Sequence, residues 1–155
     1  RWLTYPSRQE LPLLAESAQA TLKEIGIDVQ VNCTSDNNTI RKDPTLWDVF
    51  ASAMVTAPTG DPQYFFTSCA LDSSVSNNGH YHSDKLEELA AEIEKEFDTD
   101  KRSDLGIEMQ QTVLDDHAYV FCSHLKMSMI MQSNVTGLVA HPCDYYELTA
   151  DLDIN

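Results

Sequence analysis

Basic residues are scarce in this 155-residue sequence, which has 10 Lys and Arg against 25 Asp and Glu and a formal net charge of −15. A surface of this sign repels phosphate backbones and anionic lipid headgroups, so nucleic acid and membrane surfaces are not expected partners. Long apolar runs are also missing, and the sequence therefore contains no candidate membrane span. With 42% apolar residues the chain can still bury the core of one domain.

Closely spaced cysteines are missing as well. The four cysteines lie far apart and form no C-x-x-C pair, which argues against a zinc ribbon or a thioredoxin-like redox site. Their neighbours are apolar or strand-like, a context in which a free cysteine behaves as a small hydrophobic residue. We therefore expect separate buried thiols and no metal cluster, and the sequence leaves a disulfide open, for Cys33, Cys69, Cys122 and Cys143.

The sequence also lacks the common catalytic motifs G-x-S-x-G, P-loop, H-E-x-x-H and G-x-G-x-x-G. Asp115, Asp116 and His117 lie together at a predicted helix end, where capping charges are common. His124, in a strand-like run, is typical of a packed or edge residue. The sequence predicts that the protein is not an enzyme. A metal-dependent hydrolase is the weakest alternative because no nucleophile is grouped with a base.

A strand–helix–strand pattern opens the chain. Residues 2–5 predict a strand, residues 9–25 a helix with one apolar face, and residues 27–32 a half-buried strand. Gly26 lies where a left-handed helix end is favoured. Two such strands are expected to be parallel neighbours with a right-handed crossover. The other predicted elements are strands at 47–55, 119–121 and 127–131, and helices at 83–97 and 101–115. In the 83–97 helix the apolar residues, Phe97 among them, line one face, and the glutamates form a solvated acidic face.

A long polar stretch, residues 56–88, joins a predicted strand to a predicted helix and ends its loop in Gly79-His80-Tyr81-His82. Long irregular segments inside compact domains are usually functional or disordered, and we interpret this one as functional. In an extended piece, His80 and His82 would point to the same side and could face one ligand. Two histidines do not complete a metal site, and a polar loop that merely contains histidines is an equal alternative.

Several motifs agree in order and spacing with one known family. They are Tyr5-Pro6-Ser7-Arg8-Gln9-Glu10-Leu11-Pro12, Leu22-Lys23-Glu24-Ile25-Gly26-Ile27, Trp47-Asp48, Thr59-Gly60-Asp61-Pro62, the Asn-rich loop, Lys101-Arg102 and Val135-Thr136-Gly137-Leu138. With these motifs the chain resembles the substrate-binding proteins of nickel and peptide ABC importers, extracellular solute-binding protein family 5. The resemblance implies an α/β lobe, a three-layer sandwich of the type II periplasmic-binding-protein-like fold.

The resemblance also implies a domain organisation and partners. Residues 1–138 would form the second lobe, and residues 139–155 a return segment towards a missing first lobe. We expect a piece of a longer protein, because the sequence opens directly on a strand pattern. The family implies an extracytoplasmic monomer, periplasmic or anchored to the cell surface as a lipoprotein, which delivers a small molecule or metal chelate to a membrane permease.

Within the family, two ligand classes compete. Peptide-binding members typically carry a carboxylate shortly before Gly-Asp-Pro, to meet the peptide amino terminus, whereas residues 56–59 here contain no acid. A buried ammonium without its counter-charge costs about 3–5 kcal/mol. The Ala57-Pro58 step and the run from His141 to Glu147 resemble the nickel-type branch, and Ni(II) suits imidazole. We favour nickel or a metal chelate. The alternatives are an oligopeptide-binding protein and a sensor or interaction domain without transport.

Ligand-binding residues are expected where loops meet beyond the carboxyl ends of the strands. Three segments would converge there. They are the turn after the predicted 47–55 strand, the loop from Asn77 to His82, which we call the histidine loop, and the start of the return segment at His141. His80 and His141 are the expected metal-facing imidazoles. The full set of expected ligand-binding residues is Thr56, Asp61, His80, Tyr81, His82 and Asp144.

Overall fold

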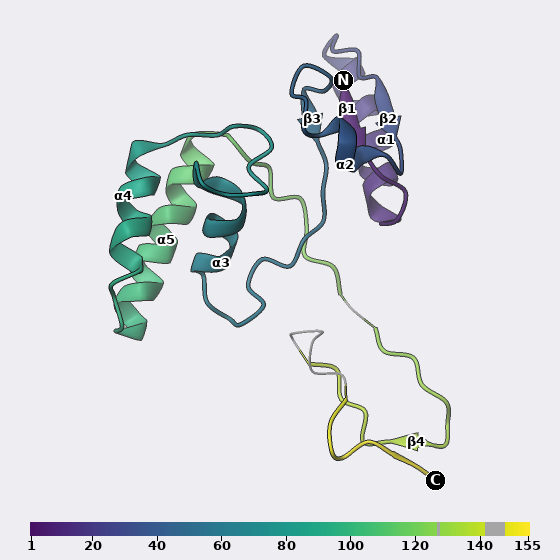
Figure 1. Ribbon diagram of the computed structural model, residues 1–155. Coiled ribbons are helices and arrows are strands. Elements are labelled where there is room, and N and C mark those ends of the chain that lie inside the picture. Colours follow the sequence, from purple (N-terminus) through teal and green to yellow (C-terminus); the bar gives the residue numbers. More distant parts are fainter. Residues whose placement is uncertain (127, 142–147) are drawn as a thin grey trace.

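The structure is a computed structural model that describes residues 1–126, 128–141 and 148–155. Figure 1 shows a small sheet flanked by helices, a separate group of packed helices, and a C-terminal segment that contains β4. We call residues 1–53 the sheet unit and residues 61–121 the helical unit.

The sheet unit contains a three-stranded parallel sheet, ordered β2-β1-β3. Its strands are β1 (Trp2–Thr4), β2 (Val31–Cys33) and β3 (Val49–Phe50). Leu3 of the central strand is in register with Asn32 on one side and with Phe50 on the other. The predicted parallel pairing of the first two strands, with a helix between them, is confirmed.

Helix α1 (Glu10–Glu24) crosses between β1 and β2 and packs against both strands. Leu11 and Ala15 are buried on its sheet side, as the apolar spacing predicts. Gly26 has φ +84°, which confirms the predicted left-handed helix end. Ile25, which the apolar spacing of the predicted 9–25 helix places on the buried face, is 71% exposed, because the helix ends before it. A short helix, α2 (Asn37–Ile40), lies in the link that follows β2.

Both outer strands are shorter than the sequence predicts. β2 covers 31–33 instead of 27–32, and β3 covers 49–50 instead of 47–55. The central strand has only three residues, so it offers no backbone partners to a longer neighbour. Alternation of apolar residues therefore overestimates strand length here.

The helical unit contains α3 (Gln63–Phe65), the π-helical turn η1 (Phe66–Ala70), α4 (Asp84–Ile93) and α5 (Thr99–Asp115). Figure 1 shows α4 and α5 side by side, with α3 next to α5 in this view. None of the helices in the described ranges has the length and apolarity needed to cross a bilayer. The core of the unit consists of Phe66, Ala70, Leu71, Leu86, Leu89, Ala90, Ile93, Met109 and Val113.

Helix α4 ends at Ile93, earlier than the predicted 97, and α5 begins at Thr99. The turn between them is built by carboxylates. Glu96 accepts the backbone N–H of Asp98 at 2.9 Å, and Asp98 caps α5 by accepting two amides of its first turn. The chain thus reverses before Phe97 reaches the core. Phe97 was expected on the buried face and is 92% exposed, so that prediction is wrong.

The strands predicted at 119–121 and 127–131 are not formed in the described residues, and residue 127 lies outside them. Tyr119 packs against the core of the helical unit without forming a strand, whereas in the second run Ile130 is 96% exposed. A strand pattern needs a neighbouring strand, and no described segment pairs with this one. The chain instead forms an antiparallel pair of β4 (Val135–Thr136) and β5 (Asp153–Ile154).

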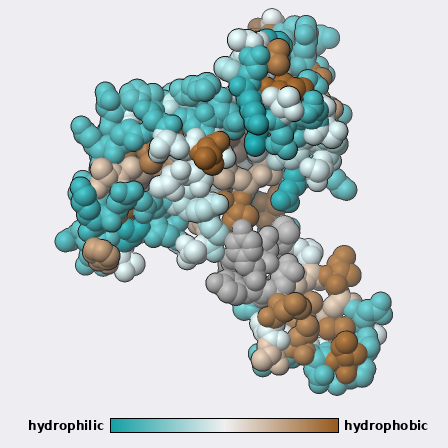
Figure 2. Space-filling view, in the orientation of Figure 1, coloured by the Kyte–Doolittle hydropathy of each residue, from teal (hydrophilic) through white to brown (hydrophobic). Residues whose placement is uncertain are grey.

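Apolar surface gathers on the C-terminal segment, where Figure 2 shows brown side chains, whereas the helical unit is mostly hydrophilic outside.

In the C-terminal segment Gly137 makes the turn after β4, with φ +76°. A Cβ atom at this position would lie 1.8 Å from the carbonyl oxygen of Asp151, so glycine is required there.

Candidate functional site

The loop between η1 and α4 is fastened from inside by one amide side chain. The Oδ1 atom of Asn77 accepts the backbone N–H of Tyr81 at 2.9 Å, and its Nδ2 atom donates to the carbonyl of Tyr81 at 2.7 Å and of Leu71 at 3.2 Å. Ser74 adds a hydroxyl that donates to the carbonyl of Thr67 at 2.8 Å. A loop whose backbone groups are paired in this way holds one shape.

Tyr81 connects this loop to the end of α5. Its hydroxyl donates to a carboxylate oxygen of Asp116 at 2.5 Å, and its ring packs edge-on against Tyr119 at 6.2 Å. Burial, followed by the bond to Asp116, raises the pKa of the Tyr81 hydroxyl. Tyr119 in turn donates to the carbonyl of Cys69 at 2.6 Å, and burial raises its pKa to about 12. The hydroxyl and the ring of Tyr81 are thus already paired, with Asp116 and Tyr119.

His82 lies between two carboxylates. Its Nδ1 atom is 2.9 Å and 3.0 Å from the two carboxylate oxygens of Asp72, and its Nε2 atom is 3.3 Å from Oδ1 of Asp84. The hydrogen bond to Asp72, helped by the charge of that group, raises the pKa of His82. The ring is thus held at the start of α4.

His80 differs from His82 in backbone and environment. It has φ +52°, a left-handed conformation that is uncommon outside glycine, and its backbone N–H donates to the carbonyl of Asn77 at 3.3 Å. Its side chain is exposed and makes no hydrogen bond to the described residues. The shared orientation expected of His80 and His82 requires an extended backbone, and the left-handed conformation of His80 does not provide one.

Asp61 has a structural partner that the sequence did not reveal. One carboxylate oxygen accepts the backbone N–H of Gln63 at 2.8 Å, and the other accepts Nη2 of Arg102 at 2.7 Å. The Gln63 amide first, and Arg102 next among the favourable contacts, hold the pKa of Asp61 below its usual value. Arg102 also donates to the carbonyls of Ile93 and Glu96, at 2.5 Å and 2.9 Å. The pair joins the 56–61 turn to both long helices.

The expected convergence of three segments is not seen among the described residues. Thr56 is half-buried in its turn, but β3 ends at Phe50, so that turn does not directly follow a strand. His141 is exposed, and no described contact connects it to the 71–83 loop. Asp144 lies outside the described residues. Within the described ranges, no three His, Cys, Asp or Glu side chains are grouped to hold a metal ion.

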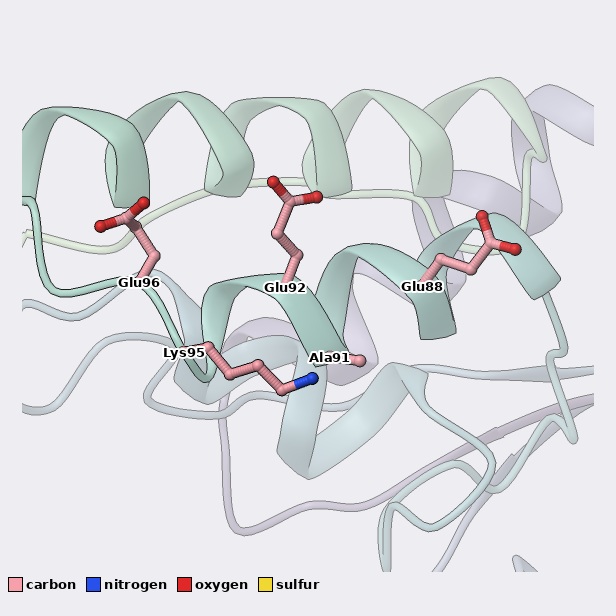
Figure 3. Close-up of a pocket in the computed structure, with 5 residues that line it drawn as sticks. All are labelled: Glu88, Ala91, Glu92, Lys95 and Glu96. Carbon is pink, nitrogen blue, oxygen red and sulfur yellow. The ribbon is translucent and has the colours of Figure 1, made fainter.

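The outer surface of α4 carries a shallow hollow of about 400 Å³. Figure 3 shows the carboxylates of Glu88, Glu92 and Glu96 on one side of the helix and the ammonium of Lys95 on the other. The hollow is open to solvent, and apart from Ala91 its lining residues are charged. We interpret it as the solvated acidic face that the charge pattern of this helix predicts.

The cysteines are only partly as expected. Cys69 is buried against Met54, with the two sulfur atoms 3.1 Å apart, and burial raises the pKa of its thiol. Cys33 and Cys122 are exposed free thiols, so the expectation of burial is wrong for them. Cys33 ends an edge strand, and Cys122 lies in the unpaired strand-like segment. Cys143 lies outside the described residues.

Comparisons with known proteins bear on the fold of these units. A search of the solved structures finds the nickel ABC transporter from Bacillus halodurans, with a TM-score of 0.73 and 25% identity over 99% of this chain and 32% of that chain. NikA from Staphylococcus aureus, solved in complex with Ni(L-His)2, has a TM-score of 0.72 and 24% identity over 74% of this chain and 25% of that chain. The α/β class and the type II periplasmic-binding-protein-like fold are confirmed.

The sequence comparison agrees. The nickel-binding protein NikA of Staphylococcus aureus (strain NCTC 8325 / PS 47) is 26% identical over 104 residues, which are 67% of this chain and 21% of that protein. No family model matches the sequence. These findings confirm the resemblance to the solute-binding proteins of nickel and peptide ABC importers, on the nickel-type branch. The chain spans between a fifth and a third of the length of these relatives. The relatives are named as binding and transport proteins, not as enzymes.

Proposed function

We propose that this chain is a lobe of the substrate-binding component of an ABC importer, which captures nickel or a nickel chelate outside the cytoplasm and delivers it to a membrane permease. The observation that carries the proposal is the match to the Bacillus halodurans nickel transporter over nearly the whole chain. The sequence relative, a nickel-binding protein, supports the same ligand. The protein has no catalytic role in this proposal.

Binding would follow the closure of two lobes around a ligand. Residues 1–138 form the second lobe in this proposal, and residues 139–155 return towards the first. Closure is a population shift, so it requires contacts that are better made in the closed state. About half of those contacts would come from the other lobe, and the present residues alone are expected to bind weakly. The complete protein acts as a monomer that meets its permease in the closed form.

A chelated ion fits the few donors on this chain. The described residues contain no complete group of metal ligands, so a small organic chelator would supply most of the coordination. Staphylococcus aureus NikA was solved with nickel bound by two L-histidine molecules. Such a complex needs little more than one protein imidazole, and imidazole is a ligand that Ni(II) accepts well.

His80 is the best placed donor of the described histidines. Its neighbour Tyr81 is fixed by the Asn77 amide and by Asp116, and His82 is held by Asp72. His80 therefore extends from a rigid turn while its own ring stays free of partners among the described residues. A preorganised donor loses little conformational entropy on binding, which favours affinity. We assign His80 and His141 as the metal-facing imidazoles and Thr56, Asp61, Tyr81, His82 and Asp144 as their neighbours in the closed site.

A peptide ligand is the second candidate, because the dipeptide-type protein DppA from Helicobacter pylori, solved with the peptide STSA, has a TM-score of 0.62 and 24% identity. Capture of a free amino terminus requires a carboxylate. In the 56–61 turn the acid is Asp61, whose two oxygens already accept Gln63 and Arg102. Because Asp61 already has these partners, it is not free to bind a peptide amino terminus, and we favour the nickel chelate over a peptide as the ligand.

The test is a calorimetric titration of the protein, as its source produces it, with Ni(II) alone and with Ni(II) plus excess L-histidine. We expect tighter binding with histidine and a loss of at least about tenfold in His80→Ala and His141→Ala, which corresponds to 1.4 kcal/mol. His124→Ala is the matched control, because His124 is also exposed and lies in neither segment. Unchanged affinity in both variants would show that the site assignment is wrong, and binding of neither nickel form by the wild type would contradict the function.

A further inference from the structure

The segment that follows α5 has the sequence pattern of strands but no partner strand. In the ranges 117–126 and 128–134 the described residues form neither helix nor strand, although the sequence predicts strands at 119–121 and 127–131. Two of its apolar side chains, Val120 and Ile130, are 85% and 96% exposed. Unpaired strand-like backbone offers its N–H and C=O groups to any strand that can lie beside it.

The same segment carries four soft metal donors at a regular spacing. Cys122 and His124 are two residues apart, and so are Met129 and Met131. Cys122 is an exposed free thiol, His124 is exposed, and Met131 is 53% exposed. Thiolate and thioether sulfur atoms are soft ligands that suit Cu(I), and imidazole binds copper as well. We propose that these four side chains bind one Cu(I) ion, around which residues 121–132 fold into a β-hairpin.

The register of the hairpin follows from the positions of the donors. Four residues separate His124 from Met129, and hairpin loops of this length are common. When these two residues lie opposite each other, Cys122 lies opposite Met131. Opposite residues of an antiparallel pair project to the same face, and so do residues i and i+2 of one strand. The hairpin therefore presents all four donors on one face, with Cβ atoms about 4.5–5.5 Å apart across the strands.

The other face of the hairpin is apolar and has a surface to cover. It carries Phe121 and Ile130, which alternate with the donors along the chain. Phe121 already packs on the helical unit, with its ring centroid 5.4 Å from that of Phe65 and 6.2 Å from that of Tyr119, on which it is stacked. This contact directs the apolar face towards the helical unit, so the donor face stays accessible to an ion.

The ion supplies the stability that a short hairpin lacks. Two isolated strands are marginal in water, and metal binding contributes free energy to the folding of its own site. The described donors are not grouped before binding, which agrees with a site that forms around the ion. The Cys122 thiol releases its proton to solvent as its sulfur binds Cu(I). Two of the four donors are thioethers, which suit Cu(I) rather than Ni(II), so this site is independent of the proposed nickel site.

An anaerobic titration of the protein, as its source produces it, with Cu(I) in competition with bicinchoninate tests the site. We expect one ion per protein and at least tenfold weaker binding in the double variant Met129→Leu/Met131→Leu, which keeps the side-chain volume and removes both sulfur atoms. Cys122→Ser should also weaken binding and remove the proton release. Two control variants should bind as the wild type does. They are Cys33→Ser, at an exposed thiol outside the segment, and Met54→Leu.

NMR with Ag(I), a redox-inert ion of the same charge and similar softness, tests the hairpin. One equivalent should produce nuclear Overhauser contacts between the backbones of residues 122 and 131, and slower amide exchange in both strands. Equal Cu(I) affinity in the wild type and the double methionine variant would overturn the site, as would an equal loss in Cys33→Ser. A bound ion without the contacts between residues 122 and 131 would overturn the hairpin. None of these results depends on nickel binding, because no nickel is added.

Discussion

The helical unit and the sheet unit bury their apolar residues to different degrees. The helical unit encloses nine residues in one core, with Ile93, Met109 and Val113 completely buried. In the sheet unit Leu3, Leu11 and Ala15 are buried, but Leu13, Ile25 and Ile27 are about half exposed or more. It also contains two buried polar atoms, Nε1 of Trp2 and Oε1 of Glu10, that have no partner in the described structure. Buried polar atoms are normally paired.

This difference indicates that the two units do not contribute equally to the stability of the protein. The helical unit makes its contacts within one stretch of sequence, from Asp61 to Phe121. The sheet unit has three short strands, and its two outer strands each have one free edge. We therefore expect the helical unit to hold its structure through its own core, whereas the sheet unit depends on further chain for part of its cover.

The largest expected effect is on the helical core. Ile93→Ala should lower the free energy of unfolding of this unit by about 2–5 kcal/mol, because it leaves a cavity at a fully buried site. Ile25→Ala, in the sheet unit, should change stability by less than about 0.5 kcal/mol because that side chain is exposed. Native-state hydrogen exchange measures the first change at the α4 and α5 amides and the second at the α1 amides. Equal losses in the two variants would contradict the comparison.

Arg102 comes next, because it joins both long helices to the 56–61 turn. Arg102→Gln should destabilise the helical unit by about 1–3 kcal/mol, since it removes the charged partner of Asp61 and takes away the donor to the carbonyl oxygen of Glu96 in the α4–α5 turn. The matched control is Lys101→Gln, whose ammonium is exposed and 3.8 Å from Glu96. Thermal unfolding should separate the two variants clearly.

The same pair gives a pH dependence with a defined sign. The folded pKa of Asp61 lies below its unfolded value, so its stabilisation is present above about 3.9 and is lost as the pH falls through the folded pKa. The wild type should therefore lose more stability than Asp61→Asn in acid. Parallel acid unfolding curves for the two proteins would contradict this role of Asp61.

Substitutions at two glycines, one tightly packed and one open to solvent, test the packing of the helical unit. A Cβ atom at Gly106 of α5 would lie 2.9 Å from the Cβ atom of Pro62, a stiff ring with little room to move. Gly106→Ala should cost about 1–3 kcal/mol in overpacking, offset by about 1 kcal/mol of helix propensity. Gly79→Ala is the control, because nothing lies within 4 Å of its added Cβ atom. If Gly106→Ala is more stable than the wild type, Pro62 does not pack tightly against α5.

The smallest expected effect concerns the acidic face of α4. Glu88 and Glu92 stand four residues apart within α4, and a like-charge pair at this spacing in a helix destabilises by about 0.2–0.5 kcal/mol. Glu92→Gln should therefore raise stability slightly at low salt and lose this advantage at about 1 M salt, where screening is nearly complete. Glu16→Gln in α1 is the control, and thermal unfolding at both salt concentrations is the measurement.

The sequence predicts the elements that local pattern determines. The parallel β1–β2 pair, α1 with its glycine end and the buried face of α4 follow from periodicity and capping. Strand lengths are predicted poorly because β2 and β3 depend on a three-residue partner. The strands expected at 119–121 and 127–131 need a partner that the described chain does not offer. The β4–β5 pair brings residues 135 and 154 together, and no local pattern predicts such a contact.

The site is less predictable than the fold. The histidine loop was predicted because two histidines stand in a long polar stretch. The left-handed backbone at His80 and the contact between His82 and Asp72, which are 10 residues apart in sequence, were not predicted, because both depend on the folded structure. Arg102 belongs to a family motif, but the motif alone gives it no role. Its role follows from its hydrogen bond to Asp61, which is 41 residues away in sequence. Hydrogen bonds over such separations depend on the completed fold.

The central claim is that this chain serves a protein that carries nickel with a small chelator. Native mass spectrometry of the protein purified from its source tests it most directly, because a bound ligand keeps its mass. We predict an added mass equal to one nickel ion plus one or more small organic molecules, which disappears after treatment with EDTA. A bound peptide that survives EDTA, with no nickel present, would contradict the account.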